Sequence, residues 1–324
     1  MTDRSDDAFS LVADIGGTNT RVAVARGTAL RKDTIRRFSN AEHEGLEAVL
    51  RHYLKDIGKV DCKGACVAVA GPVRDGVGAM TNLHWTIDTT TLARATNATN
   101  ARVINDLQAQ GHSLGHLSGD KTPVVLKAPP HSPRAVRLVI GVGTGFNAAA
   151  VYETEYGRLV PPSECGHANL PVRTGDELRL LRFVETAHGF PAVEDVLSGR
   201  GLERIYAWLS SEAGHPAKRK AADIMTSVET GDDAIATEAV ARFVRILGTV
   251  AGNLSLIHLP FGGVYMAGGV ARALGPYLVR FGFGDAFRDK GRFDGFMRNF
   301  GVSLIEDDYA ALTGCAHFLG QTHV

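Results

Sequence analysis

The chain has 324 residues, and its 35 Lys and Arg balance its 35 Asp and Glu, so the formal net charge at pH 7 is zero. A neutral chain creates no long-range field that would attract nucleic acid, and the densest basic run, Lys218-Arg219-Lys220, fits a solvated helix face. With 44% hydrophobic residues and 37 glycines, the composition excludes disorder and indicates a globular α/β protein of about two domains.

The first seven residues are acidic and polar, without the basic start and apolar stretch of a secretory signal, so we expect a cytoplasmic location. Residues 246–271 carry no charge and are long enough to span a bilayer, but Asn253, His258 and Pro260 interrupt them. We expect a buried helix, a turn and a core strand there. The four cysteines form no C-x-x-C pair, so we expect free thiols.

The first predicted element is an apolar strand at residues 9–14, which ends in Asp14. A glycine-rich bend at 15–19 follows, and then a second β-like run at 21–25. This pattern predicts a hairpin with polar residues at its bend.

The same pattern returns later in the chain, with an apolar run at 137–140, a glycine-rich turn at 141–145 and a returning strand at 147–152. Two related halves, each opening with a hairpin whose glycines let an anion approach, indicate a cleft between two α/β domains. We place the small domain at 1–115 plus 305–324 and the large domain at 116–304.

Further elements follow the usual periodicities and turn signals. We expect helices at 46–57, 235–254 (ended by Pro260) and 309–319, strands at 66–70, 101–104 and 264–267, and a loop at 127–133. Strands that alternate with helices predict βαβ units and a mainly parallel sheet. The last helix should pack back on the first domain.

The two glycine turns are candidate phosphate cradles, because backbone N–H groups converge on an anion only where no Cβ blocks the approach. The alternative is that each is an ordinary hairpin turn. Each turn carries a threonine, and the first follows Asp14, a carboxylate placed to hold Mg²⁺ directly or through water. A Walker A sequence is absent, and the Rossmann fingerprint fails at Phe146.

Seven short motifs occur in an order that resembles the bacterial glucokinase family. They are DIGGTNTR at 14–21, MTNLHW at 80–85, IND at 104–106, GTG at 143–145, ECGH at 164–167, VLSG at 196–199 and AGG at 267–269. The resemblance spans about residues 9–320. It implies two RNase H-like, actin-like ATPase domains around a cleft, and transfer of phosphate from ATP to the 6-hydroxyl of glucose, the entry to glycolysis. It also implies a homodimer.

The resemblance assigns roles to individual residues. Asp106 would be the catalytic base that faces the sugar hydroxyl, although an Asp between a strand and a helix is also a good N-cap. Asn82, Asn105, Asp106, Glu164, His167 and Glu194 would bind the sugar. The nucleotide would contact Ala13, Asp14, Ile15, Gly16, Gly17, Thr18, Gly143, Thr144, Gly145, Gly268 and Gly269, with Asp14 serving the Mg²⁺.

A zinc site is the alternative for Cys165-Gly-His167, but structural zinc needs four ligands and no cysteine cluster follows. We expect no zinc, and a Cys165 that packs as a small apolar side chain.

Two departures from the family pattern affect sugar preference and KM more than reaction type. The family usually reads Gly-Glu-Gly-Gly-His where this chain has residues 163–167, and Phe146-Asn147 replaces a small or glycine-rich pair. A kinase for mannose, fructose or N-acetylglucosamine therefore stays open. So does a regulator that binds hexose without turnover, although regulators of the related group carry an N-terminal helix-turn-helix, for which we expect no room before residue 9.

Overall fold

The structure is a computed structural model that describes residues 8–58, 60–80 and 83–321. It forms two compact units. The first consists of residues 1–118, 153–162 and 307–324, and the second of 119–152 and 163–306. The sequence-based division placed 153–162 in the second domain, which is corrected here: Arg158 donates hydrogen bonds to three carbonyl oxygens of the first unit, those of Gly111, His112 and Leu114.

The described part of the first unit contains four α-helices. They are α1 (Leu46–Ile57), α2 (Thr89–Thr96), α3 (Asp106–Ser113) and α12 (Ala310–Gly320). Its strands are β1 (Phe9–Ile15), β2 (Asn19–Arg26), β3 (Ala29–Leu30), β4 (Arg36–Ser39), β5 (Cys62–Val69), β6 (Val73–Arg74), β7 (Val77–Ala79), β8 (Thr86–Asp88), β9 (Asn100–Asn105) and β13 (Gly157–Leu159).

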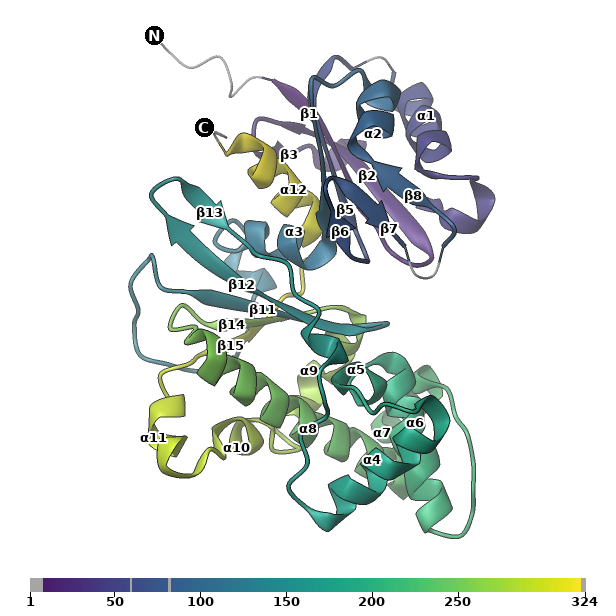
Figure 1. Ribbon diagram of the computed structural model, residues 1–324, viewed down its shortest axis with the longest axis vertical. Helices are drawn as coiled ribbons and strands as arrows, with labels where there is room; N and C mark the ends of the chain where they lie inside the picture. The colour runs from purple at the N-terminus through teal and green to yellow at the C-terminus, as the bar shows by residue number, and fades with distance from the viewer. Residues whose placement is uncertain (1–7, 59, 81–82, 322–324) are drawn as a thin grey trace. The chain divides into compact units, whose positions relative to one another are not determined.

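Side chains alternate between the two faces of the main sheet of the first unit, and helices pack on both faces, so the unit has three layers. The main sheet has the order β3-β2-β1-β5-β9, with β4 on β2. Helices α1 and α2 cover one face of this sheet, and α3 and α12 cover the other (Figure 1). Leu11 and Ala13 of β1 belong to the core on the first face, and Val12 belongs to the core on the second. The expected docking of the last helix on the first domain is confirmed.

The expectation of a mainly parallel sheet is wrong for half of this sheet. Strands β1, β5 and β9 are parallel, but β2 pairs antiparallel with β1, β3 and β4. Short hairpin connections enforce antiparallel pairing, because a parallel crossover needs a dozen or more residues. Strands β6, β7 and β8 form a separate small sheet that the sequence did not indicate.

The second unit is rich in helices. They are α4 (Gly175–His188), α5 (Val193–Val196), α6 (Gly199–Glu212), α7 (Ala221–Thr230), α8 (Ala234–His258), α9 (Gly269–Leu278), α10 (Phe283–Arg288) and α11 (Asp294–Met297). Its strands are β10 (Val124–Leu126), β11 (Arg137–Val142), β12 (Phe146–Thr154), β14 (Val264–Ala267) and β15 (Val302–Leu304), in the sheet order β10-β15-β14-β11-β12.

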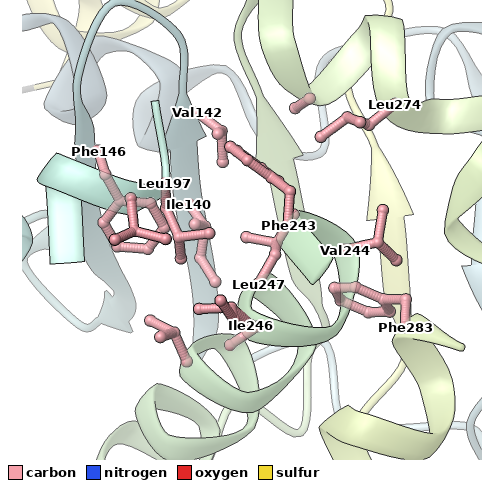
Figure 2. Close-up of a cluster of buried hydrophobic side chains, with 14 of the residues drawn as sticks. Ile140, Val142, Phe146, Leu197, Phe243, Val244, Ile246, Leu247, Leu274 and Phe283 are labelled. Atoms are coloured by element: carbon pink, nitrogen blue, oxygen red, sulfur yellow. The ribbon is translucent and has the colours of Figure 1, made fainter. Parts of the chain in front are cut away.

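Helix α8 is the centre of the second core. Figure 2 shows Phe243 and Leu247 of this helix packed toward Ile140 of β11, while Val244 lies beside Phe283. By length and composition alone α8 could cross a membrane, but 67% of its most apolar window is buried inside the protein. The buried helix, turn and core strand expected at 246–271 are confirmed, because α8 ends at His258 and β14 begins at Val264.

The basic run at 218–220 lies before a helix instead of on one. Lys220 is the N-cap residue of α7. Arg219 donates to Asp233 Oδ2 at 2.8 Å, and Asp233 in turn caps the start of α8. The prediction of a solvated helix face is therefore wrong, because the middle residue of the run serves a structural ion pair.

Candidate active site

The first glycine turn joins β1 to β2 in an antiparallel hairpin. Gly16 donates its N–H to the carbonyl oxygen of Asn19 at 3.0 Å, which closes the turn. Asn40, only 2% exposed, fixes the turn from the far side: its Nδ2 donates to Gly16 O at 2.8 Å and its backbone N–H donates to Thr18 O at 2.9 Å. Gly17 and Thr18 remain exposed at the tip, where their N–H groups can meet an anion.

Asp14 lies one residue before the end of β1, opposite Arg21 of β2. Its side chain is 19% exposed, and Arg21 Nη1 lies 3.5 Å from Asp14 Oδ2. Burial raises the pKa of Asp14, and the Arg21 charge opposes this only in part. A partly buried carboxylate with an incompletely neutralised charge fits a divalent cation, because Mg²⁺ prefers oxygen ligands.

The second glycine turn joins β11 to β12. Gly143 donates its N–H to Gly145 O, and its own carbonyl accepts from Gly199 N–H, both at 2.9 Å. A Cβ on Gly145 would lie 2.4 Å from Glu194 Oε2, so any larger residue here would push the Glu194 carboxylate from its place. Thr144 is exposed at the tip. The two hairpins expected from the repeated pattern are confirmed as hairpins.

The third glycine turn lies beside the second one at the same edge of the second sheet. Gly141 of β11 and Ala267 of β14 are parallel register partners, so the turns after them are neighbours. Gly268 has φ 103°, and a Cβ there would lie 2.4 Å from Val142 O. Gly269 opens helix α9 with nothing within 4 Å of an added Cβ. A phosphate can therefore approach the N-terminus of this helix.

Asn105 and Asp106 lie at the carboxyl end of β9, at the edge of the first sheet that also carries the first glycine turn. Ile15 of β1 pairs with Val69 of β5, and Val69 pairs with Asn105 of β9, so these three strands end in register. Parallel strands that end together place their following residues at one edge, where α/β sheets bind ligands.

The N-cap of α3 is Asn105 and not Asp106. Asn105 Oδ1 accepts from Leu107 N–H at 2.9 Å, and Asn105 Nδ2 donates to Gly71 O at 3.0 Å. Asp106 is the first residue of α3 and is half-buried, and its Oδ1 accepts from Leu107 N–H at 2.9 Å. The capping role suggested for Asp106 is thus corrected, because Asn105 fills it.

The proposed sugar residues of the second unit lie around β12 and α5. Glu164 and His167 are exposed on either side of Gly166, with His167 Nε2 and Glu164 Oε2 4.0 Å apart. Glu194 of α5 accepts from Phe146 N–H at 3.0 Å. Position 166 between them requires glycine, because a Cβ there would lie 1.9 Å from the backbone oxygen of Phe146. Asn82 lies outside the described residues.

The two departures from the family pattern have structural roles. Phe146 is 3% exposed and points into the core, where Figure 2 shows it beside Leu197. Asn147 holds the Glu164 segment: its Nδ2 donates to Ser163 O and lies 3.4 Å from Glu164 Oε2, and its Oδ1 accepts from Cys165 N–H at 3.2 Å. Neither change removes a carboxylate or imidazole from the site.

Cys165 is half-buried, and its Sγ donates to Asn147 Oδ1 at 3.5 Å. Burial raises the pKa of this thiol. Within residues 8–58, 60–80 and 83–321, no three His, Cys, Asp or Glu side chains are grouped to hold a metal ion.

Sequence reasoning missed the residues that hold these loops in place. Asn40 lies more than twenty positions from the turn that it fixes, and no local pattern marks it. Gln108 completes a capping box with Asn105 by accepting from Asn105 N–H at 3.0 Å. That residue could have been found, because an amide three positions after an N-cap is a recognised signal.

Comparisons with known proteins agree with this architecture. The family model named Glucokinase matches residues 11–322. A curated glucokinase from Saccharophagus degradans is 32% identical over 315 residues, which cover 96% of this chain and 98% of that one. A solved glucokinase from an Antarctic psychrotroph is 30% identical, with a TM-score of 0.84 over 96% of this chain and 98% of that one.

A solved glucokinase from Balamuthia mandrillaris, in complex with glucose, shares the fold at 23% identity, with a TM-score of 0.81 over 98% of this chain and 94% of that one. The fold is thus that of the actin-like sugar kinases, a class of phosphotransferases. The chain belongs to the glucokinase family. Membership makes it an ATP-dependent kinase that phosphorylates glucose.

Proposed function

We propose that Asp106 is the base that orients the 6-hydroxyl of glucose and takes its proton as the γ-phosphoryl group of ATP is transferred. The observation that carries this proposal is the common register of Ile15, Val69 and Asn105, which places Asp106 and the first glycine turn at one sheet edge. Asn105 is the N-cap of α3, and Asp106 follows it at the carboxyl end of β9, where α/β sheets bind ligands.

Phosphoryl transfer passes through a loose transition state, so positioning and charge stabilisation supply most of the acceleration. The nucleotide phosphates meet the N–H groups of Gly17 and Thr18 in the first unit. In the second unit they meet residues 143–145 and the start of α9 at Gly269. Ala13, Ile15, Gly16 and Gly268 shape these turns.

Asp14 would hold Mg²⁺, directly or through water, because its carboxylate is partly buried and incompletely neutralised. When bound, the ion neutralises charge on the phosphates. Glucose contacts come from Asn82, Asn105, Glu164, His167 and Glu194. These groups combine donors and acceptors, as a ring of hydroxyls requires.

The product, glucose 6-phosphate, enters glycolysis. We place the enzyme in the cytoplasm and infer a homodimer. Family resemblance supports both proposals. Sedimentation velocity at several protein concentrations tests the dimer, since a monomer at every concentration would exclude it.

The Asp106→Ala variant tests the role of the base. We expect kcat to fall by at least about 10²-fold while the KM for ATP stays unchanged, because a general base contributes about 10²- to 10⁴-fold. Asp120→Ala is the matched control, since Asp120 is an exposed carboxylate in a short 3-10 turn. Glucose-dependent ADP release measures both variants. Full turnover by Asp106→Ala would remove Asp106 from the mechanism.

A further inference from the structure

Helix α3, which begins at Asp106, is held at both ends by one short segment of chain, residues 157–160. Near the start of the helix, Gln108 Nε2 donates to Val160 O at 2.7 Å. At its end, Arg158 Nη1 donates to the carbonyl oxygens of Gly111 at 3.1 Å, His112 at 2.9 Å and Leu114 at 2.7 Å. The helix is therefore fixed along its length as well as by its own cap.

Arg158 can serve as a rigid support because it is itself fixed. Its side chain is 10% exposed and forms an ion pair with Glu153. Val160 is 3% exposed, so the carbonyl that receives Gln108 belongs to a buried part of the chain. A hydrogen bond to a fixed, buried acceptor restrains its donor more than a bond to a mobile surface loop does.

Gln108 uses both ends of its amide group. Its Oε1 accepts from the backbone N–H of Asn105 at 3.0 Å, and its Nε2 donates to Val160 O at 2.7 Å. The amide thus joins the residue before Asp106 to the buried segment. Asn105 is also tied on its other side, because its Nδ2 donates to Gly71 O at 3.0 Å. The backbone at Asp106 is therefore anchored in two directions.

The chemistry of this bridge requires an amide. Glutamate is the other common residue at this position of a capping box, and its oxygen would accept from Asn105 N–H equally well. An ionised carboxylate has no hydrogen to donate, so its second oxygen would face the carbonyl oxygen of Val160. Only glutamine, or a protonated glutamate, satisfies both partners.

We propose that Gln108 is a positioning residue for Asp106, which sets the place of the base without touching the substrate. This inference rests on the role proposed for Asp106. Displacement of a reacting group by about 1 Å can cost about 10²-fold in rate, so the loss of one anchor should reduce kcat measurably. Gln108 lies outside the glycine turns, so the KM for ATP should not change.

Two substitutions and a matched control test this role. Gln108→Leu removes both hydrogen bonds, and Gln108→Glu keeps the acceptor but loses the donor. Gln110→Leu is the control, because Gln110 lies on the same helix and its buried Oε1 has no hydrogen-bond partner among the described residues. We expect kcat to fall about tenfold or more in both Gln108 variants, with an unchanged KM for ATP, and to stay within twofold of wild type in Gln110→Leu.

The pH dependence of Gln108→Glu separates positioning from a general loss of structure. Glutamate titrates near pH 4.3, and a facing carbonyl oxygen favours its protonated form, which can donate to Val160 O as glutamine does. The ratio of the variant's kcat to that of wild type should therefore rise as the pH falls from about 7.5 to about 5. This readout also serves if Gln108→Leu does not fold.

The outcomes distinguish the two proposals. If Asp106→Ala keeps full turnover, the role of the base fails, and that of Gln108 fails with it. If Asp106→Ala is inactive while both Gln108 variants keep the kcat of wild type, only the positioning role is overturned. A Gln108→Glu ratio that stays flat with pH would also overturn it, because a damaged fold would not recover on protonation.

Discussion

Asn105 donates from Nδ2 to the backbone oxygen of Gly71, 3.0 Å away, and so joins the end of β9 to the turn after β5. The same side chain caps α3, and the residue is 8% exposed. We expect Asn105→Ala to lower the free energy of unfolding by about 1–2 kcal/mol, because it removes an N-cap and a buried hydrogen bond. Urea unfolding measures this change. The exposed Asn169→Ala is the control, and equal stabilities would contradict the prediction.

Asp14→Asn should raise stability and lower activity together. Burial raises the pKa of Asp14 in the folded protein, so the folded state holds this proton more tightly than the unfolded chain does. The group therefore contributes less stability as the pH rises through the folded pKa, and its ionised form is unfavourable at neutral pH. We expect a higher Tm at pH 7.5 without Mg²⁺, and a lower kcat with Mg²⁺ and ATP. A lower Tm, or full activity, would contradict this assignment.

Two adjacent glycines should respond differently to alanine. Gly268→Ala places a Cβ on a residue with φ 103° and 2.4 Å from Val142 O, so we expect a loss of about 1–3 kcal/mol in stability. Gly269→Ala meets nothing within 4 Å and should fold normally. Its methyl group would occupy the approach to the N-terminus of α9, so its KM for ATP should rise. Thermal unfolding measures the loss of stability in Gly268→Ala, and steady-state kinetics measure the KM for ATP of Gly269→Ala. If the two variants had the same stability and the same KM, both predictions would be contradicted.

His317 should make the protein less stable in acid. Burial, with the nearby charges of His116 and Arg158, lowers the pKa of His317 to about 4. Between pH of about 6.5 and about 4 the unfolded chain binds this proton before the folded protein does, so stability falls with pH over that window.

The variant His317→Phe checks this explanation. It removes the titrating group and keeps a ring to stack on His116, where the ring centroids are 3.5 Å apart. Its Tm should fall less than that of wild type between pH 7 and pH 5. The exposed His131→Phe serves as the control. Parallel curves for His317→Phe and wild type would show that another group causes the acid sensitivity.

Elements with strong periodicity were predictable from the sequence. The helix at 46–57 has the expected bounds. Helix α8 continues a few residues beyond the predicted C-terminal end and stops at His258, because the next residue, Leu259, adopts φ 48°. Both glycine hairpins follow from apolar runs on either side of a glycine bend. The small sheet of β6, β7 and β8 was not predictable, since its strands have two or three residues and no clear alternation.

Contacts between distant segments explain what the sequence could not show for the site. Its motifs mark Asp106, but the hydrogen bond from Asn105 to Gly71, 34 positions away, exists only because the fold brings the two residues together. Phe146 looked like a change in the nucleotide loop, yet the β12 register turns it into the core. Likewise, residues 153–162 belong to the first unit because of the side-chain contacts of Arg158 and Gln108.

The most direct measurement is a crystal structure of the protein with glucose and a non-hydrolysable ATP analogue. Our account predicts an Asp106 carboxylate oxygen within about 2.6–3.2 Å of the sugar 6-hydroxyl oxygen, with phosphates against the glycine turns at Gly17 and Gly269. An Asp106 side chain directed away from the sugar, or phosphates bound elsewhere, would contradict it.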